Sequence, residues 1–431
     1  MSVDNATYVS PQARSLPLDT TPDLVGDRWA APTWKQLVVT GSVAAGAVIL
    51  GLGHLASRRR FGACAGLLAG VAALGVGVAH AIGRPLDSAL AAPHSTALTV
   101  GERQFLEEHP TALGAESFRH AERIGRKLTG IAPDSFVSYY QAMSEEQADV
   151  IRQNRVSEEA SCWEWSNGVE FQRAEVVAED GARLMGNYCV TDPASGKWAL
   201  LVHGWCDAWN EMTVYARAYA EHGFNLLIPE MRGHGESGGE IVGLGWLDRR
   251  DLVQWLRWLV DERRAEQIVA HGHSMGAASV CLMSAELDLP AELRATVCDC
   301  GFSDVLNVFA PIIRNGIPFS TDGIVGLILD LMRLAVKLRP DGFDLADASP
   351  ERAAHDARVP VLLIHGMADT FIPPYMARRI FEALPADKGK LLEVPGAGHC
   401  QSVLADPELY WGTVFEFLGS AGVSTTVPLS K

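Results

Sequence analysis

The sequence is poor in cysteine and in basic residues, and both shortages limit what the protein can be. Eight cysteines among 431 residues are too few for a disulfide-held scaffold. Lys and Arg number 36 against 52 Asp and Glu, and the formal net charge of −16 argues against a surface that neutralises nucleic-acid phosphates. Charged residues are only 20% of the chain and apolar residues 48%, which excludes a disordered protein.

Two stretches near the N-terminus, 37–56 and 61–82, contain no Asp, Glu, Lys or Arg. Each is about 20 residues long, enough for a helix to cross the hydrocarbon core of a bilayer. Only the segment Ser-Arg-Arg-Arg at 57–60 separates them. Because arginine-rich loops stay on the cytoplasmic side, we expect a two-span transmembrane hairpin in the cell membrane, with the rest of the chain outside the cytoplasm.

Other interpretations of these stretches stay open. The arginines at 58–60, the apolar run after them and Ala-His-Ala at 79–81 are also typical of a secretory signal peptide. Buried core helices are a further alternative. With a hairpin at 37–82, residues 1–36 form an N-terminal tail. Residues 83–169 show helical spacing but no motif, and form a helical connector or an N-terminal helical addition to the domain that follows.

From about residue 170 short β-rich runs alternate with helical ones, which indicates a mostly parallel α/β sheet with helices on both faces. Eight strands are predicted, at 171–178, 183–190, 198–203, 224–229, 267–271, 295–298, 360–365 and 390–394. They make one domain at 170–420, followed by a C-terminal tail at 421–431. Since ligands of such sheets bind beyond the carboxyl ends of the strands, a site is expected in the turns there.

The turn after the strand at 267–271 reads Gly-His-Ser-Met-Gly at 272–276 and leads directly into a helical run at 277–287. A serine at a sharp strand-to-helix turn holds its hydroxyl clear of the backbone, and the flanking glycines remove side chains that would collide there. We therefore predict that Ser274 is a nucleophile. The alternative is an ordinary glycine-rich turn.

A serine hydroxyl needs a base, and the base needs an orienting carboxylate. His399 and Asp369 each follow a predicted strand, so they belong to the same edge of the sheet as Ser274. We expect His399 to take the serine proton and Asp369 to hold the imidazole. Asp299 and Asp304, which follow the strand at 295–298, compete for the role of the acid.

The turn His203-Gly204-Trp205 ends another predicted strand. Acyl chemistry develops an oxyanion, and backbone N–H groups stabilise it. The N–H of Met275, directly after the nucleophile, is one expected donor, and that of Trp205 is the other. His203 is expected to hold this loop through hydrogen bonds.

These motifs together resemble the alpha/beta hydrolase superfamily over about residues 170–420. They are HGW at 203–205, PEMRGHGESGG at 229–239, GHSMG at 272–276, HGMAD at 365–369 and GAGH at 396–399. The resemblance implies a triad of Ser274, Asp369 and His399, and an oxyanion hole of Trp205 and Met275. GLGWLDR at 243–249 and SMGA at 274–277 are further similar to membrane-anchored hydrolases of Gram-positive bacteria, which are serine-aminopeptidase-like or esterase-like.

Between about 303 and 350 the chain leaves the alternating pattern, where this fold commonly inserts a helical lid. Only Asp330, Arg333 and Lys337 are charged within 324–338, and their spacing places them on one helix face. The apolar opposite face indicates an acyl pocket or a surface that rests on lipid, with plain core packing as the alternative.

The sequence thus predicts a serine hydrolase that cleaves esters with an apolar acyl group through an acyl-enzyme on Ser274. A peptidase, a thioesterase or an acyltransferase would use the same residues, and a non-catalytic binding module is another alternative. The expected partners are a small or lipid-like ester and the membrane, without nucleic acid.

No cofactor or metal is predicted. His271 and His273 resemble a metal-binding pair, but the nucleophile turn already explains His273. Cys298 and Cys300 are expected to pack in the core. Arg232 is expected to stabilise its own loop.

Overall fold

The structure is a computed structural model that describes residues 144–425 apart from 206, 317–320 and 340. The chain divides into two units, Met1–Gly83 and Arg84–Lys431, and all described residues belong to the second. The predicted transmembrane hairpin at 37–82 and most of the predicted connector therefore lie outside the described residues. Within the described part, no helix combines the length and the apolar character needed to cross a bilayer.

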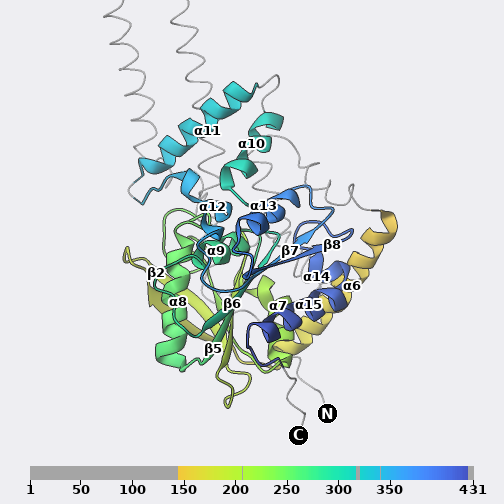
Figure 1. Ribbon diagram of the computed structural model, residues 1–431. Coiled ribbons are helices and arrows are strands. Elements are labelled where there is room, and N and C mark those ends of the chain that lie inside the picture. The colour runs from red at the N-terminus through yellow and green to blue at the C-terminus, as the bar shows by residue number, and fades with distance from the viewer. Residues whose placement is uncertain (1–143, 206, 317–320, 340, 426–431) are drawn as a thin grey trace, which may run out of the picture. The chain divides into compact units, whose positions relative to one another are not determined.

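One eight-stranded sheet forms the centre of the domain (Figure 1). Its strands are β1 (Gln172–Val177), β2 (Arg183–Cys189), β3 (Lys197–Val202), β4 (Asn225–Pro229), β5 (Gln267–His273), β6 (Leu293–Asp299), β7 (Val361–Gly366) and β8 (Gly389–Val394). The spatial order is β1-β2-β4-β3-β5-β6-β7-β8. β2 runs antiparallel to both of its neighbours, and β3 to β8 are parallel. The predicted eight-stranded, mostly parallel sheet is confirmed.

β5 is longer than the sequence indicates, because its pairing with β6 continues through the glycine at its end. Gly272 pairs with Cys298 and His273 with Asp299. The two strands thus remain parallel up to the residue before Ser274. The nucleophile turn therefore starts from the sheet itself and not from a loop.

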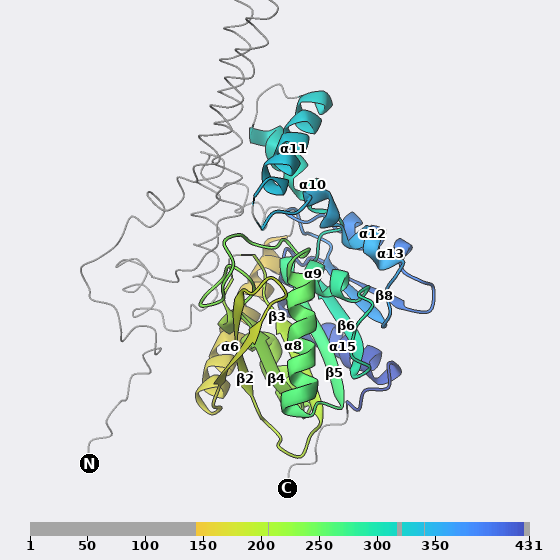
Figure 2. The same cartoon turned by 90° about the vertical axis from the view of Figure 1, so that its left-hand side faces the viewer.

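Helices cover both faces of the sheet, as the pattern predicts (Figures 1 and 2). On one face lie α8 (Asp248–Arg263), α9 (Met275–Met283), α12 (Pro350–Ala354) and α13 (Tyr375–Ala383). On the other lie α6 (Glu145–Asn167), α7 (Thr213–Glu221), α14 (Ser402–Ala405) and α15 (Pro407–Ser420). A 3-10 turn, η3 (Trp209–Met212), precedes α7.

α8 shows how side-chain spacing decides the packing. Its apolar residues recur at i, i+3, i+4 and i+7, and all four of them are buried: Leu252, Trp255, Leu256 and Leu259. A Cβ added at Gly186 of β2 would lie 3.0 Å from the Trp255 ring. The glycine therefore leaves the space that the indole fills.

α6 belongs to the range predicted as a helical connector or an addition to the domain, and it packs on the α/β domain. Its N-terminus is closed by a capping box between Ser144 and Gln147. Ala148 and Ile151 are buried in the same core as α7 and α15. The amide of Asn154 also donates a hydrogen bond of 2.8 Å to the carbonyl of Leu404.

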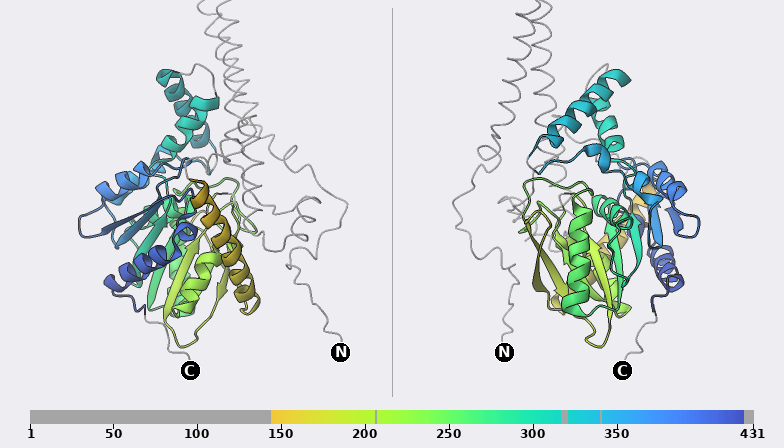
Figure 3. Two further views of the ribbon diagram at one scale, coloured as in Figure 1. Left: turned by 90° about the vertical axis from the view of Figure 1, so that its right-hand side faces the viewer. Right: turned by 60° about the vertical axis from the view of Figure 1, so that its left-hand side comes forward.

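The predicted lid region contains two helices, α10 (Val305–Gly316) and α11 (Asp322–Lys337), and a 3-10 turn, η4 (Leu345–Asp347). Both helices stand beyond the carboxyl ends of the parallel strands (Figure 3). α11 carries two apolar stripes. One is buried and comprises Val325, Ile328, Met332 and Val336. The other is exposed and comprises Ile324, Leu327, Leu331, Leu334 and, just after the helix, Leu338.

Candidate active site

Ser274 lies at a sharp elbow between β5 and α9. Its φ of 53° and ψ of −120° are a conformation that a residue with a Cβ rarely adopts. A Cβ at Gly272 would lie 2.3 Å from the carbonyl oxygen of Gly276, and a Cβ at Gly276 would lie 2.2 Å from that of Val202. Only glycine fits at both positions, which explains the Gly-x-Ser-x-Gly pattern physically.

The structure brings Ser274, His399 and Asp369 into one hydrogen-bonded chain. His399 Nε2 lies 2.9 Å from Ser274 Oγ, and His399 Nδ1 lies 2.7 Å from Asp369 Oδ2. An ionised carboxylate only accepts hydrogen bonds, so Nδ1 carries the proton and Nε2 is left to accept the serine O–H. The other oxygen of Asp369 accepts the backbone N–H groups of Phe371 and Ile372, at 2.9 and 2.8 Å.

Charge and burial act in opposite directions on both ionisable groups. Burial raises the pKa of Asp369, but His399 and His365 lower it by more and leave it at about 2. Burial lowers the pKa of His399, but the Asp369 carboxylate and the Cys300 thiol raise it by more, so it lies well above the ordinary value of 6.5. The pair is therefore an ionised acid beside a base of increased strength.

The two competing acids have other partners. Asp299 is fully buried and its Oδ2 accepts a hydrogen bond of 2.9 Å from the hydroxyl of Tyr410. Asp304 accepts the backbone N–H of Leu306 at the start of α10, at 2.9 Å. Of the three candidate carboxylates, Asp369 is the one hydrogen-bonded to His399.

Two side chains hold the loop that carries Trp205: His203, which precedes Trp205 in the chain, and Asp207, which follows it. Met231 N–H donates to His203 Nε2 at 3.0 Å, so His203 Nδ1–H donates to the Gly204 carbonyl at 2.8 Å. Asp207 Oδ2 accepts the Gly204 N–H at 3.1 Å and also bonds His273 Nε2 at 2.8 Å. His203 thus holds the loop, as expected.

Asp207 was not singled out by the sequence, although it stands two residues after Trp205. It links the loop before it to His273, which directly precedes Ser274. Met275 is buried and opens α9, where the first N–H groups of a helix have no acceptor within the helix. The oxyanion roles of Trp205 and Met275 remain predictions.

His271, which with His273 resembles a metal-binding pair, and Arg232 have structural partners. His271 lies between the hydroxyls of Tyr219 and Tyr410, at 3.1 and 3.0 Å, and burial lowers its pKa to about 3. Arg232 is paired with Asp251 at 2.8 Å and stabilises its loop, as expected.

One group within the described residues has the composition of a metal site: Cys300, His399 and Cys400, whose ligand atoms lie within 4.8 Å of one another. Both ring nitrogens of His399 are already hydrogen-bonded, to Asp369 and to Ser274. The histidine is thus engaged with the serine and the carboxylate.

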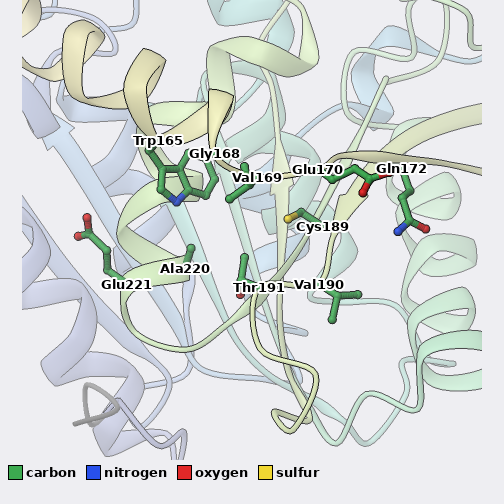
Figure 4. A pocket seen from close by; sticks show the side chains of 10 residues that line it. All are labelled: Trp165, Gly168, Val169, Glu170, Gln172, Cys189, Val190, Thr191, Ala220 and Glu221. Atoms are coloured by element: carbon green, nitrogen blue, oxygen red, sulfur yellow. The ribbon is translucent and has the colours of Figure 1, made fainter. Parts of the chain in front are cut away.

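A cavity of about 490 Å³ lies elsewhere in the domain (Figure 4). It is lined by residues from the end of α6, from β2 and from α7, among them Trp165, Cys189 and Glu221. Cys189 pairs with Leu226 at the start of β4, whereas Ser274 follows the carboxyl end of β5. This cavity is therefore not part of the Ser274 site.

Residues 199–411 match the model of the alpha/beta hydrolase family, and with its strand order and nucleophile elbow the chain belongs to the alpha/beta hydrolase superfamily. Among curated relatives, it is 27% identical to the uncharacterized protein YqkD of Bacillus subtilis, over 49% of this chain and 67% of the relative. It is also 27% identical to a monoacylglycerol lipase of Mycolicibacterium smegmatis, over 53% of this chain and 89% of the relative.

Solved structures with a similar fold include the Pyrococcus furiosus esterase Pf2001. That structure has a TM-score of 0.48 and 22% identity, covering 59% of this chain and 92% of its own.

Proposed function

We propose that the protein is a serine hydrolase that cleaves carboxylic esters with an apolar acyl group. The observation that carries this proposal is the hydrogen-bonded chain from Ser274 Oγ through His399 to Asp369, at 2.9 and 2.7 Å. Ser274 lies at a strained strand-to-helix turn, and a turn of this kind holds the serine hydroxyl clear of the backbone.

The proposed reaction has two halves. His399 Nε2 takes the proton of Ser274 Oγ as that oxygen attacks the ester carbonyl, and the N–H groups of Met275 and Trp205 stabilise the oxyanion. The proton then passes from His399 to the leaving alkoxide, which departs as an alcohol. Water attacks the acyl-enzyme with His399 as the base, releasing the acid and restoring Ser274.

The exposed apolar side chains of the lid helix α11 favour the proposal of an apolar substrate. Leu327, Leu334 and Leu338 of the exposed stripe on α11 are each more than half exposed, at 59, 53 and 53%. An amphipathic helix of this kind rests on lipid with its apolar face. The monoacylglycerol lipase among the relatives supports an acylglycerol ester as the substrate. We further propose that the apolar segments within 37–82 attach the enzyme to the cell membrane.

A fluorophosphonate probe, which reacts only with activated serines, tests the nucleophile. The wild-type protein is expected to be labelled and Ser274→Ala is not. Ser284→Ala is the matched control. Ser274 directly precedes α9 and Ser284 directly follows it. Ser284 is buried, and its hydroxyl donates to the carbonyl of Cys281. A folded wild-type protein without labelling would contradict the proposal and favour the binding module.

The substrate class is tested separately with p-nitrophenyl esters of two to twelve carbons and an aminoacyl p-nitroanilide. We expect kcat/KM to rise with acyl length, because longer chains bury more apolar surface. Faster cleavage of the amide than of every ester would overturn the ester assignment and favour the peptidase.

A further inference from the structure

Two cysteines lie beside the imidazole of His399. Cys300 follows β6 and is fully buried, whereas Cys400 directly follows His399 in the chain and is half-buried. Their sulfur atoms are 3.3 Å apart although the residues are 100 positions apart in sequence. Both sulfurs lie within 4.8 Å of a ring nitrogen of His399.

The backbone at both cysteines is unusual. Cys300 has a φ of 50° and Cys400 a φ of 55°, in the left-handed region that residues with a Cβ rarely adopt. The N–H of Cys300 donates to the carbonyl of Ile364 at 2.8 Å, which ties this residue to the neighbouring strand β7. The two thiols thus meet where both cysteines have a left-handed backbone conformation. Ordinary packing of Cys300 in the core would not need such a conformation at either residue.

We propose that Cys300 and Cys400 are a reversible thiol–disulfide pair that switches off the hydrolase site when it is oxidised. This regulatory role rests on the proposed function of Ser274 and His399. Formation of the disulfide itself does not rest on it.

The oxidant we propose is a peroxide. The Cys400 thiolate attacks one peroxide oxygen, the O–O bond breaks, and protonation of the leaving oxygen gives water and a Cys400 sulfenic acid. The Cys300 sulfur then attacks Cys400 Sγ, the S–OH bond breaks, and the thiol proton leaves with the hydroxide as a second water. The two thiols together lose two electrons and two protons, and the peroxide gains them. A dithiol reverses the step by thiol–disulfide exchange: it gives up two electrons and two protons, becomes a disulfide itself and restores both cysteine thiols.

Access decides which thiol reacts first. Cys400 is half-buried and Cys300 has no exposed surface, so a small oxidant meets Cys400. The hydrogen bond with Cys300 lowers the pKa of Cys400, but burial and nearby carboxylates raise it by more. Because the thiolate is the reacting form, the oxidation is best followed in a mildly alkaline buffer.

Closing the disulfide changes the site through the backbone of Cys400. The sulfurs must approach from 3.3 Å to about 2.05 Å. Cys300 is held to β7, so the movement falls on Cys400 and on its neighbour His399. The 2.9 Å hydrogen bond from Ser274 to His399 is thereby disturbed, and the serine loses its base.

The experiment treats the reduced full-length protein in detergent with hydrogen peroxide, then with dithiothreitol. Ester turnover, fluorophosphonate labelling and a tryptic peptide map are measured at each stage. We expect a Cys300–Cys400 cross-linked peptide, at least a fivefold fall in kcat/KM with weaker labelling, and recovery of both with dithiothreitol. A map without this cross-link, or a cross-linked protein of unchanged activity, would overturn the proposal.

Variants are each compared with their own reduced state. Cys300→Ala and Cys400→Ala are expected to lose the reversible response to peroxide, and Cys189→Ala, a buried cysteine of β2, to keep it. If Cys300→Ala or Cys400→Ala fails to fold, the peptide map of the wild-type protein still decides the question. A reduced protein that neither labels nor hydrolyses esters refutes the proposed function, while the cross-link still shows the thiol pair.

Discussion

At the scale of single residues, the proposed activity depends on whether the imidazole of His399 is neutral or protonated. In the proposed reaction its imidazole must be neutral to accept the proton of Ser274, yet the Asp369 carboxylate raises the pKa of His399 against the effect of burial. Hydrolysis should therefore fall as the pH drops through a value above 6.5, the ordinary pKa of histidine.

Asp369→Asn tests this relation. Removing the carboxylate charge lowers the pKa of His399, so the acid limb of kcat/KM moves to lower pH. The plateau should fall by up to about 10⁴-fold, since the amide no longer fixes the tautomer. The measurement is a pH profile of ester hydrolysis from pH 5 to 10 for both proteins, and an unshifted limb would refute the role of Asp369.

At the scale of elements, the elbow between β5 and α9 has no room for a side chain. Gly276→Ala would place a Cβ 2.2 Å from the Val202 carbonyl oxygen, and we expect it to destabilise the fold by about 3 kcal/mol or more. Gly412→Ala is the matched control, because no heavy atom beyond the adjoining backbone of its own helix lies within 4 Å of the added Cβ. Alanine also stabilises a helix by about 1 kcal/mol relative to glycine. Thermal unfolding of both variants measures the difference, and equal midpoints would contradict the packing.

The exposed stripe of α11 makes a second prediction at this scale. Leu327→Ser with Leu334→Ser should leave the unfolding midpoint nearly unchanged, because surface substitutions cost about 0.5 kcal/mol or less. The same change should reduce hydrolysis of long-chain esters held in lipid vesicles while sparing soluble short esters.

The control is Leu287→Ser, an exposed leucine at 80% outside the stripe, which should affect neither substrate. Equal loss on both substrates would show that the stripe acts on the site and not on lipid.

At the scale of the whole molecule, local patterns predict more of the fold than of the contacts between distant segments. Each of the eight strands is visible in its own apolar residues, and the turns after them bring Ser274, Asp369 and His399 to one edge of a parallel sheet. The order in which strands pair is not local. The Cys300–Cys400 contact depends on β7 lying between β6 and β8, so two cysteines 100 residues apart gave no signal.

The role of Asp207 could not be predicted from the sequence for a related reason. Its carboxylate joins the loop after β3 to the end of β5, and these meet only because the two strands are neighbours in the sheet. A sequence pattern shows the two segments but not their pairing.

The packing of α6 decides where a shortened form of the enzyme can begin. A chain cut at the sequence-based boundary near residue 170 would lack Ala148 and Ile151, and the apolar core beside α7 and α14 would face water. Such a protein would be prone to aggregate. A chain that starts at Ser144 keeps the capped helix and, with it, the apolar residues that α6 contributes to this core.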